Sequence, residues 1–294
     1  MPRTSSSMTL QDLGRLAKQS PFIGCSVGFH AVAVVGIWAS PAYWPFWVGG
    51  VLANHLILST VGLVPQGDLL GPNATRLPTE SAKRNEVAIT IDDGPDPDVT
   101  PEVLRILAEH DAKATFFCIG ERVRAFPDIV RQISRAGHDV ENHSRTHSRA
   151  FSLFGIRRIR AEICGCQNDV FSVVGRMPIF FRAPAGLRNP LLQPVLSAFG
   201  LRLVSWTRRG LDTIEASPEV VLRRLTRDLA AGDILVLHDG AAARTPAGGA
   251  VILEVLPDLL LQLHRAGLRT VTLDEAFRRE SDGEVILRQP GRPE

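Results

Sequence analysis

Two histidines in the segment HSRTH, residues 143–147, stand four positions apart. Side chains at positions i and i+4 of a helical turn lie on one face, so His143 and His147 can bind one divalent ion together. An open site of two histidines and a carboxylate suits catalytic zinc first, with cobalt, nickel, manganese or iron as alternatives. Without a third ligand nearby, the two would be solvated histidines.

The segment TIDDGP, residues 90–95, places two carboxylates at the end of an apolar run. Adjacent residues of an extended strand point in opposite directions, and a turn at Gly94 could direct Asp92 and Asp93 toward one pocket. One carboxylate could then bind a metal while the other acts as a general base. The alternative is an Asp-rich turn without chemistry, which is common in proteins.

Two further segments place polar side chains after apolar runs: RAPAG at residues 182–186 and LHD at 237–239. Arg182 could orient a carboxylate, and a backbone N–H of its Pro- and Gly-containing loop could face an oxyanion. His238 could act as a general acid, because the unperturbed imidazole pKa is about 6.5. Asp212 could hold that imidazole in one tautomer. The alternatives are a surface arginine and a capped strand end.

The elements that must position these side chains alternate along the chain. We expect strands at residues 86–91, 113–119, 138–141, 179–181, 201–206, 233–237 and 269–271. We expect helices that begin at Thr100-Pro101 and that cover about 127–136, 190–199, 218–231 and 251–266. Alternating strands and helices predict an α/β fold with a largely parallel sheet.

The N-terminal part differs from the rest, because residues 21–65 contain no Asp, Glu, Lys or Arg. This length accommodates two membrane-spanning helices, at about 22–40 and 44–64, with Pro41 and Pro45 at the turn. A cleaved signal peptide has a shorter apolar core, and a buried apolar subdomain is the alternative. His30 and His55 fall inside the two spans and are expected to face the interior.

The charges that flank these spans predict their orientation. Arg and Lys precede and follow the hairpin while its turn is uncharged, so both ends are expected in the cytoplasm and the catalytic domain with them. The flanking cations are Arg3, Arg15, Lys18, Arg76, Lys83 and Arg84.

Changes in composition, together with the positions of Gly and Pro, divide the 294 residues into five segments. We expect an N-terminal segment (1–20), the hairpin (21–65), a polar linker (66–85), a catalytic domain (86–280) and a flexible tail (281–294). A net charge of +2 gives no case for a nucleic-acid binder. Four cysteines without a C-x-x-C pair do not suggest a disulfide scaffold.

The order and spacing of TIDDGP, HSRTH, RAPAG and LHD resemble the polysaccharide deacetylases, also called the NodB-homology domain or carbohydrate esterase family 4. A fifth motif of that family is present only in part, at residues 206–213. The resemblance covers about residues 86–277. It implies a distorted (β/α) barrel with a divalent ion at the carboxyl ends of the strands.

The resemblance also assigns roles to the residues that match the family motifs. Asp93, His143 and His147 look like the metal ligands. Asp92 looks like the general base that activates the attacking water, and Arg182 looks like its partner. The implied activity is metal-dependent hydrolysis that removes an acetyl or other small acyl group from an N-acylated amino sugar.

Five more positions match the family's catalytic and substrate-facing residues. His238 looks like the general acid that protonates the leaving amine, and Asp212 like the residue that tunes it. Leu237 looks like part of the pocket for the acetyl methyl group. Ala185, through its backbone N–H, and Trp206 occupy positions that face the substrate.

The sequence departs from the family pattern on the substrate side. Ala185 stands where the family has an aromatic residue, Arg209 where it has an Asp and Thr213 where it has a Trp. Arg208 and Arg209 would suit a phosphate or pyrophosphate, although a solvated basic turn is the alternative. With the hairpin, these changes predict a multi-pass inner-membrane protein that acts on a lipid-linked or cell-envelope glycan. A deformylase and a non-catalytic glycan-binding module remain alternatives.

Overall fold

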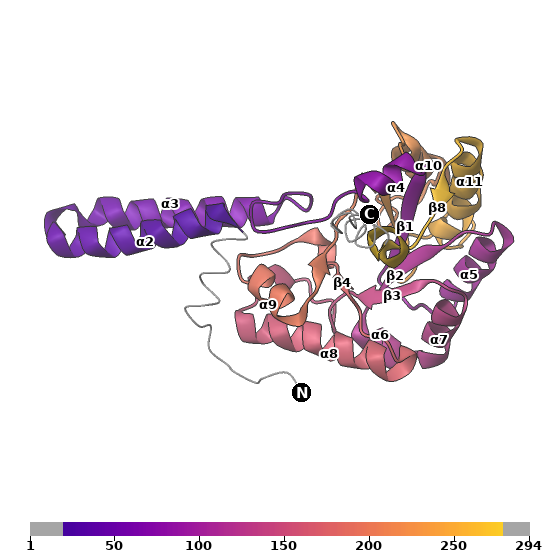
Figure 1. The fold of residues 1–294 in the computed structure, drawn as a ribbon, viewed down its shortest axis with the longest axis horizontal. Helices are drawn as coiled ribbons and strands as arrows, with labels where there is room; N and C mark the ends of the chain where they lie inside the picture. Colours follow the sequence, from indigo (N-terminus) through magenta and orange to yellow (C-terminus); the bar gives the residue numbers. More distant parts are fainter. Residues whose placement is uncertain (1–19, 279–294) are drawn as a thin grey trace, which may run out of the picture.

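The computed structural model describes residues 20–278 and contains a curved parallel sheet with helices on its outer side (Figure 1). The strand order is β5-β4-β3-β2-β1-β7-β6, and β8 pairs with the beginning of β1. The strands are β1 (Glu86–Asp92), β2 (Ala114–Cys118), β3 (Asp139–Asn142), β4 (Phe180–Phe181), β5 (Arg202–Leu203), β6 (Arg208–Arg209), β7 (Ile234–His238) and β8 (Arg269–Thr270). The predicted parallel α/β fold is confirmed, with the sheet curled into an open half-barrel.

Helices lie between the strands along the chain, and the longer ones bury an apolar stripe. They are α4 (Thr79–Lys83), α5 (Thr100–Glu109), α6 (Gly120–Ala125), α7 (Pro127–Arg135), α8 (Ile156–Val174), α9 (Leu192–Phe199), α10 (Pro218–Thr226) and α11 (Val251–Arg265), and residues 273–278 are also helical. In α11, for example, Val255, Leu259 and Leu263 recur at helical spacing and are at most 1% exposed. This packing fixes the strand ends that carry the polar motifs.

The sequence pattern does not predict helices α4, α6 and α8, the helix at residues 273–278, or strand β6, and it predicts an α10 that extends beyond Thr226. The amphipathic signal of α8 was present, because Ile159, Ile163, Cys166 and Val170 follow one another at intervals of three or four residues and are fully buried.

Residues 66–85, predicted as a linker, pack onto the sheet. Ala74 forms a parallel bridge with Val204, and Arg76 forms an antiparallel bridge with Asp233. The Arg76 guanidinium also lies 2.9 Å from the Asp233 carboxylate. The segment therefore fixes the N-terminal helices to the domain as well as connecting them.

The N-terminal helices α2 (Pro21–Ala39) and α3 (Trp44–Gly62) lie side by side and extend away from the domain (Figure 1). They are joined by a short 3-10 turn, η1 (Pro41–Tyr43). Among the described residues, α2 alone is long and apolar enough to span a membrane. Because α3 carries Asn54 and His55 within its length, the two-span hairpin predicted from the sequence is not confirmed. The expected segments at 1–20 and 281–294 lie almost wholly outside the described residues.

Candidate active site

The candidate catalytic and metal-binding residues predicted from the sequence lie together at the carboxyl ends of neighbouring parallel strands. Asp92 ends β1 and pairs in register with His238, which ends β7. Asn142 ends β3 and pairs with Phe181 of β4, so the chain continues into His143 and Arg182 side by side. Adjacent parallel strands place their carboxyl ends at one edge of a sheet, where α/β proteins bind ligands.

Three side chains direct their ligand atoms toward one point in this edge. The Asp93 Oδ1 atom lies 3.2 Å from His143 Nε2 and 3.1 Å from His147 Nε2. The three ligand atoms all lie within 4.8 Å of one another. Burial lowers the pKa of His147, with a further contribution from His143. Its imidazole is therefore held in the neutral form that binds metals.

The two histidines do not share a helical turn, contrary to the expectation from their spacing. Residues 143–147 form a loop in which Ser144 (φ 62) and His147 (φ 50) adopt left-handed backbone conformations. Asp93 (φ 73) is also left-handed, and this turn lets adjacent Asp92 and Asp93 face the same site. The convergence therefore comes from loop backbone, not from helical periodicity.

These residues fit a divalent cation. Asp93 Oδ1 is buried, and although two imidazole Nε2 atoms lie 3.1 and 3.2 Å away, no described residue donates a well-aligned hydrogen bond to it. Such an oxygen costs free energy unless a cation or another donor satisfies it. His143 Nδ1 lies 2.9 Å from the carbonyl oxygen of Arg182. If Nδ1 donates this hydrogen bond, the Nε2 lone pair is directed toward Asp93, as is usual for metal-binding histidines.

The general-base candidate is held by a buried arginine. Arg182 Nη1 donates to Asp92 Oδ1 at 2.7 Å, and the Arg182 and Asp92 residues are 1% and 2% exposed. Other nitrogens of Arg182 donate to the carbonyl oxygens of Val204 and Ser205 at 3.2 and 2.7 Å. A fully buried charge pair needs such additional hydrogen bonds, and they fix the position of the Asp92 carboxylate.

The general-acid candidate forms a second buried pair. Asp212 Oδ1 lies 2.9 Å from His238 Nδ1, and Asp212 Oδ2 accepts the backbone N–H of His238 at 2.7 Å. Burial by itself lowers the pKa of His238, but Asp212 and the nearby aspartates raise it to about 9. His238 is therefore protonated at neutral pH, as a proton donor must be.

Comparisons with known proteins agree with this site. The family model for polysaccharide deacetylases matches residues 79–204. A peptidoglycan-N-acetylglucosamine deacetylase of Bacillus cereus is 34% identical over 194 residues, which cover 65% of this chain and 88% of the relative. The chain belongs to the polysaccharide deacetylase family.

Other relatives in this family are also named for deacetylation or ester hydrolysis. A chitooligosaccharide deacetylase of Azorhizobium caulinodans is 35% identical, over 53% of this chain and 75% of the relative. A solved peptidoglycan N-acetylglucosamine deacetylase matches with a TM-score of 0.63 and 28% identity, over 70% of this chain and 92% of that one. A family 4 carbohydrate esterase from Streptomyces lividans, solved with acetate, matches with a TM-score of 0.58 and 28% identity, over 65% and 95%. Family members are hydrolases that act on carbon–nitrogen amide bonds, and so is this enzyme.

The predicted substrate-side residues of this deacetylase differ in exposure. Ala185 is exposed in the short 3-10 turn η3 (Pro184–Gly186) and has a left-handed backbone with φ 54. Trp206 is only 6% exposed, and Leu237 is 0% exposed and packs in the main core. Contact of Leu237 with an acyl methyl group stays a prediction.

Sequence reasoning missed residues that position the site without touching it. Thr90 accepts a hydrogen bond from Arg182 Nη1 at 2.7 Å. Glu162, on the unpredicted helix α8, accepts the N–H groups of Arg145 and Thr146 at 3.1 and 2.9 Å. Asn142 accepts the Ser144 N–H at 2.9 Å. The contacts of Glu162 and Asn142 hold the histidine loop. The role of Glu162 could not be recognised from the sequence, because helix α8 was not predicted.

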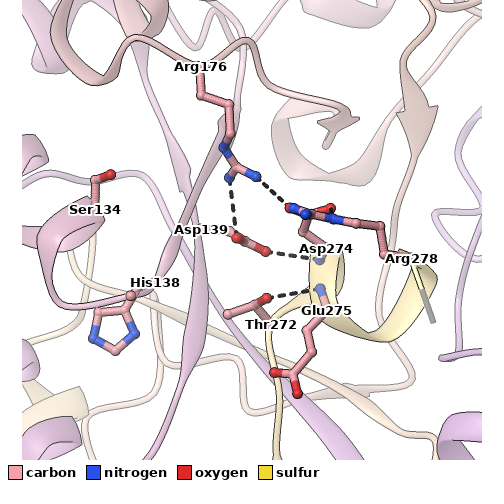
Figure 2. A pocket seen from close by; sticks show the side chains of 9 residues that line it. Ser134, His138, Asp139, Arg176, Thr272, Asp274, Glu275 and Arg278 are labelled. Carbon is pink, nitrogen blue, oxygen red and sulfur yellow. Dashed lines mark hydrogen bonds and ion pairs between the residues drawn. The ribbon is translucent and has the colours of Figure 1, made fainter.

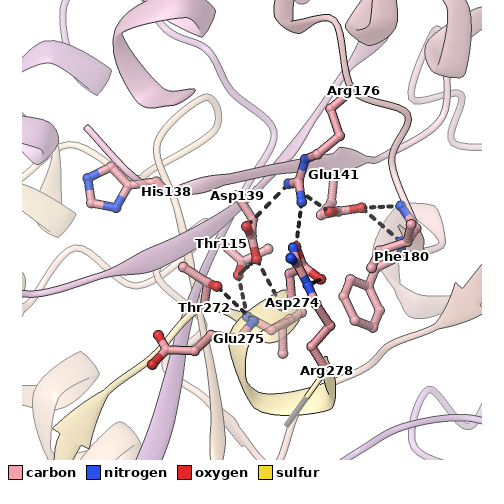
Figure 3. Close-up of polar contacts among 12 residues, drawn as sticks. Thr115, His138, Asp139, Glu141, Arg176, Phe180, Thr272, Asp274, Glu275 and Arg278 are labelled. Carbon is pink, nitrogen blue, oxygen red and sulfur yellow. Dashed lines mark hydrogen bonds and ion pairs between the residues drawn. The ribbon is translucent and has the colours of Figure 1, made fainter. Parts of the chain in front are cut away.

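A second polar cluster lies at the opposite, amino-terminal end of the strands. Figure 2 shows Arg176 between Asp139 and Asp274 in a pocket of about 480 Å³. Figure 3 adds the buried Glu141, whose carboxylate accepts the N–H groups of Ile179 and Phe180. Burial raises the pKa of Glu141 well above its usual range. The cluster joins residues 273–278 to β3, so its role is structural.

The Asp212 contact predicts a change in pH dependence. Replacement of Asp212 by Asn removes the charge that opposes burial, so the pKa of His238 should fall from about 9 toward or below the ordinary value of about 6.5. A general acid works only while it is protonated, at a pH below its pKa. Activity should therefore begin to fall at a lower pH in Asp212→Asn than in the wild-type protein. The check is the pH profile of kcat/KM, with exposed Asp228→Asn as control. An unchanged alkaline limb would contradict the assignment.

Proposed function

We propose that this deacetylase-family protein removes an acetyl group from N-acetylglucosamine or a closely related N-acylated amino sugar by metal-dependent amide hydrolysis. The observation that carries the proposal is the meeting of the Asp93, His143 and His147 cluster with two buried acid–base pairs. Those pairs are Asp92 with Arg182 and His238 with Asp212. The names of the relatives support N-acetylglucosamine glycans as the substrate class.

Asp93, His143 and His147 would hold a divalent cation, for which zinc is our first expectation. When bound, such a cation lowers the pKa of a coordinated water and polarises an amide carbonyl. Asp92, held in place by Arg182, takes the proton of the attacking water. His238 gives its Nε2 proton to the amide nitrogen as the carbon–nitrogen bond breaks, and Asp212 stabilises its charged form. The backbone N–H of Ala185 is our candidate donor to the oxyanion.

The test is turnover by the full chain, loaded with metal in detergent. N-acetylglucosamine oligosaccharides should release acetate and gain a free amine, and mass spectrometry should show the loss of one acetyl group per event. An N-formyl analogue tests for a deformylase. Glycan binding without release of any acyl group, by metal-loaded protein, would instead support a binding module and contradict the proposed reaction.

We also propose that α2 and α3 anchor the enzyme in a membrane as a hairpin. Most of the exposed large apolar side chains of the described residues lie on it, including Trp38, Phe46 and Leu56, which are 84%, 78% and 69% exposed. Exposure of such a continuous apolar surface to water would be unfavourable. The cations on both flanks favour cytoplasmic ends, although the peptidoglycan in the relatives' names suits the opposite side.

This anchoring gives a prediction for cell fractionation and topology. The full chain should remain in the membrane fraction after carbonate extraction, whereas a chain that begins at residue 66 should be released. Alkaline phosphatase should be active when inserted in the Pro41–Pro45 turn and inactive when fused after Glu294. Activity of the fusion after Glu294 would overturn the cytoplasmic placement and indicate a cell-envelope glycan.

A further inference from the structure

Arg209, on β6, is a cation with no charge partner among the described residues. Its guanidinium carbon lies 5.2 Å from the centre of the Trp206 ring, and its Nε is buried without a hydrogen-bond partner. Its neighbour Arg208 is different: its Nε donates to Asp233 at 2.8 Å, and its other nitrogens donate to the carbonyl oxygens of Arg227 and Asp228. Arg208 is therefore structural, while Arg209 has unused hydrogen-bonding capacity.

The ring beneath Arg209 belongs to the wall of the catalytic centre. The centre of the Trp206 ring also lies 5.8 Å from the guanidinium carbon of Arg182, and Arg182 holds the general base. Gly186 (φ 74) packs against the same ring so closely that an added Cβ would lie 2.6 Å from it. Arg209 also precedes Asp212, the partner of the general acid, by three residues. An anionic part of a substrate bound at this site could reach Arg209.

The base of the helical hairpin meets the same loops. Ser205 Oγ donates to the carbonyl oxygen of Pro65 at 2.6 Å, and Gln66 Nε2 donates to the carbonyl oxygen of Trp206 at 2.8 Å. The backbone N–H of Arg188 donates to the carbonyl oxygen of Gly62, at the end of α3. Figure 1 shows the hairpin leaving the domain from this region. A membrane that holds the hairpin therefore lies beside the active-site rim.

Exposed apolar side chains on the same end of the sheet point to a lipid surface. Outside residues 20–69, the two most exposed large apolar side chains of the described residues are Leu153 and Ile214, at 84% and 78%. Leu153 belongs to the loop after β3, and Ile214 to the loop after β6. Both loops follow the carboxyl ends of their strands, where the catalytic residues lie. Exposed apolar groups on loops at this end of the sheet suit contact with a bilayer.

We propose that Arg209, stacked on Trp206, binds a phosphate or pyrophosphate group attached to the N-acylated amino sugar, and that a membrane lipid carries this group. The inference rests on the proposed function and adds the chemical class of the substrate. A guanidinium is suited to phosphate because it presents several N–H donors in a fixed plane. The Trp206 ring lies against this guanidinium, and the proposed membrane hairpin would hold the site near the surface where a lipid phosphate lies.

The experiment compares three substrates with the full-length, metal-loaded protein. They are a neutral N-acetylglucosamine tetramer, the soluble diphosphate UDP-N-acetylglucosamine, and a polyprenyl-pyrophosphoryl-N-acetylglucosamine in phosphatidylcholine vesicles. Arg209→Ala should lower kcat/KM for both phosphate-containing substrates by about ten- to a hundredfold, mainly through KM. It should leave turnover of the neutral tetramer within about twofold. Arg209→Asp should have a larger effect of the same kind. If a lipid carries the phosphate group, the wild-type protein should have a higher kcat/KM for the vesicle substrate than for UDP-N-acetylglucosamine.

The matched control is Arg202→Ala. The Arg202 guanidinium carbon also lies over an aromatic ring, 4.5 Å from the Phe277 ring centre, but Arg202 belongs to β5, at the other edge of the sheet from β6. This variant should leave all three activities unchanged. Equal loss for all substrates in Arg209→Ala would show a structural role and overturn the inference. Wild-type turnover of the tetramer alone would also overturn it while leaving the proposed function intact. If no substrate turns over, the proposed function fails; calorimetry of UDP-N-acetylglucosamine binding then decides on Arg209, and equal affinity in wild type and Arg209→Ala contradicts it.

Discussion

Replacement of Asp92 by Asn should abolish turnover while the metal stays bound. Asn has nearly the same shape but cannot accept the proton of the attacking water, and loss of a general base costs about 10²- to 10⁴-fold in rate. Asp92 is not among the three residues that converge as a metal cluster, so metal content should stay stoichiometric. The measurements are kcat on an N-acetylglucosamine oligosaccharide and metal analysis of the same sample. Wild-type turnover in this variant would remove Asp92 from the mechanism.

The same substitution has a structural cost that must be separated from the catalytic one. Arg182 is 1% exposed and relies on Asp92 for charge compensation, and breaking a buried ion pair costs about 3–5 kcal/mol. The double variant Asp92→Asn with Arg182→Met removes both charges, so it should recover thermal stability relative to Asp92→Asn. It should remain inactive. Recovery of activity together with stability would mean that the single variant failed only through unfolding.

The parts of the fold that could be predicted were those whose signal is local. The run EVAITI predicts a buried strand because nearly continuous apolar residues are typical of a strand covered on both faces. In the structure every residue of β1 is buried. Short strands such as β6 have only two residues and owe their existence to pairing with β7, which no local pattern encodes. The same limit applies to residues 66–85. Their polar, Gly- and Pro-rich composition resembles a linker, whereas bridges to distant residues hold them on the sheet.

For the site, residue types were predictable and geometry was not. The spacing of His143 and His147 suggested a shared ion, but the structure brings them together through left-handed backbone at Ser144 and His147, not through a helix. The partnership of Asp212 with His238 joins β7 to a loop 26 residues earlier in the chain. The residue types and the family pattern both predict this contact, and it is present. That Arg209 lacks a charge partner among the described residues, whereas Arg208 has one, could be recognised only from the structure.

Removal of the histidine pair should remove the metal and all metal-dependent properties together. In His143→Ala with His147→Ala, Asp93 is left as the single ligand of the cluster, which cannot hold a zinc ion at an open three-ligand site. We expect stoichiometric metal in wild-type protein, none in the double variant, and turnover below detection. Chelation should abolish wild-type activity, and zinc or cobalt should restore it. Elemental analysis and acetate release measure both effects.

Stability gives an independent readout of the same site. A ligand that binds only the folded state stabilises it by about 2.7 kcal/mol at one hundred times its dissociation constant, so zinc should raise the melting temperature of metal-free wild-type protein. The double variant should show no such rise. The control is His110→Ala with His264→Ala, which removes two exposed histidines outside the site and should keep metal, activity and the zinc-induced shift. Stoichiometric metal that persists without His143 and His147 would place the ion elsewhere. The assignment of Asp93, and with it the division of labour between the two adjacent aspartates, would then be wrong.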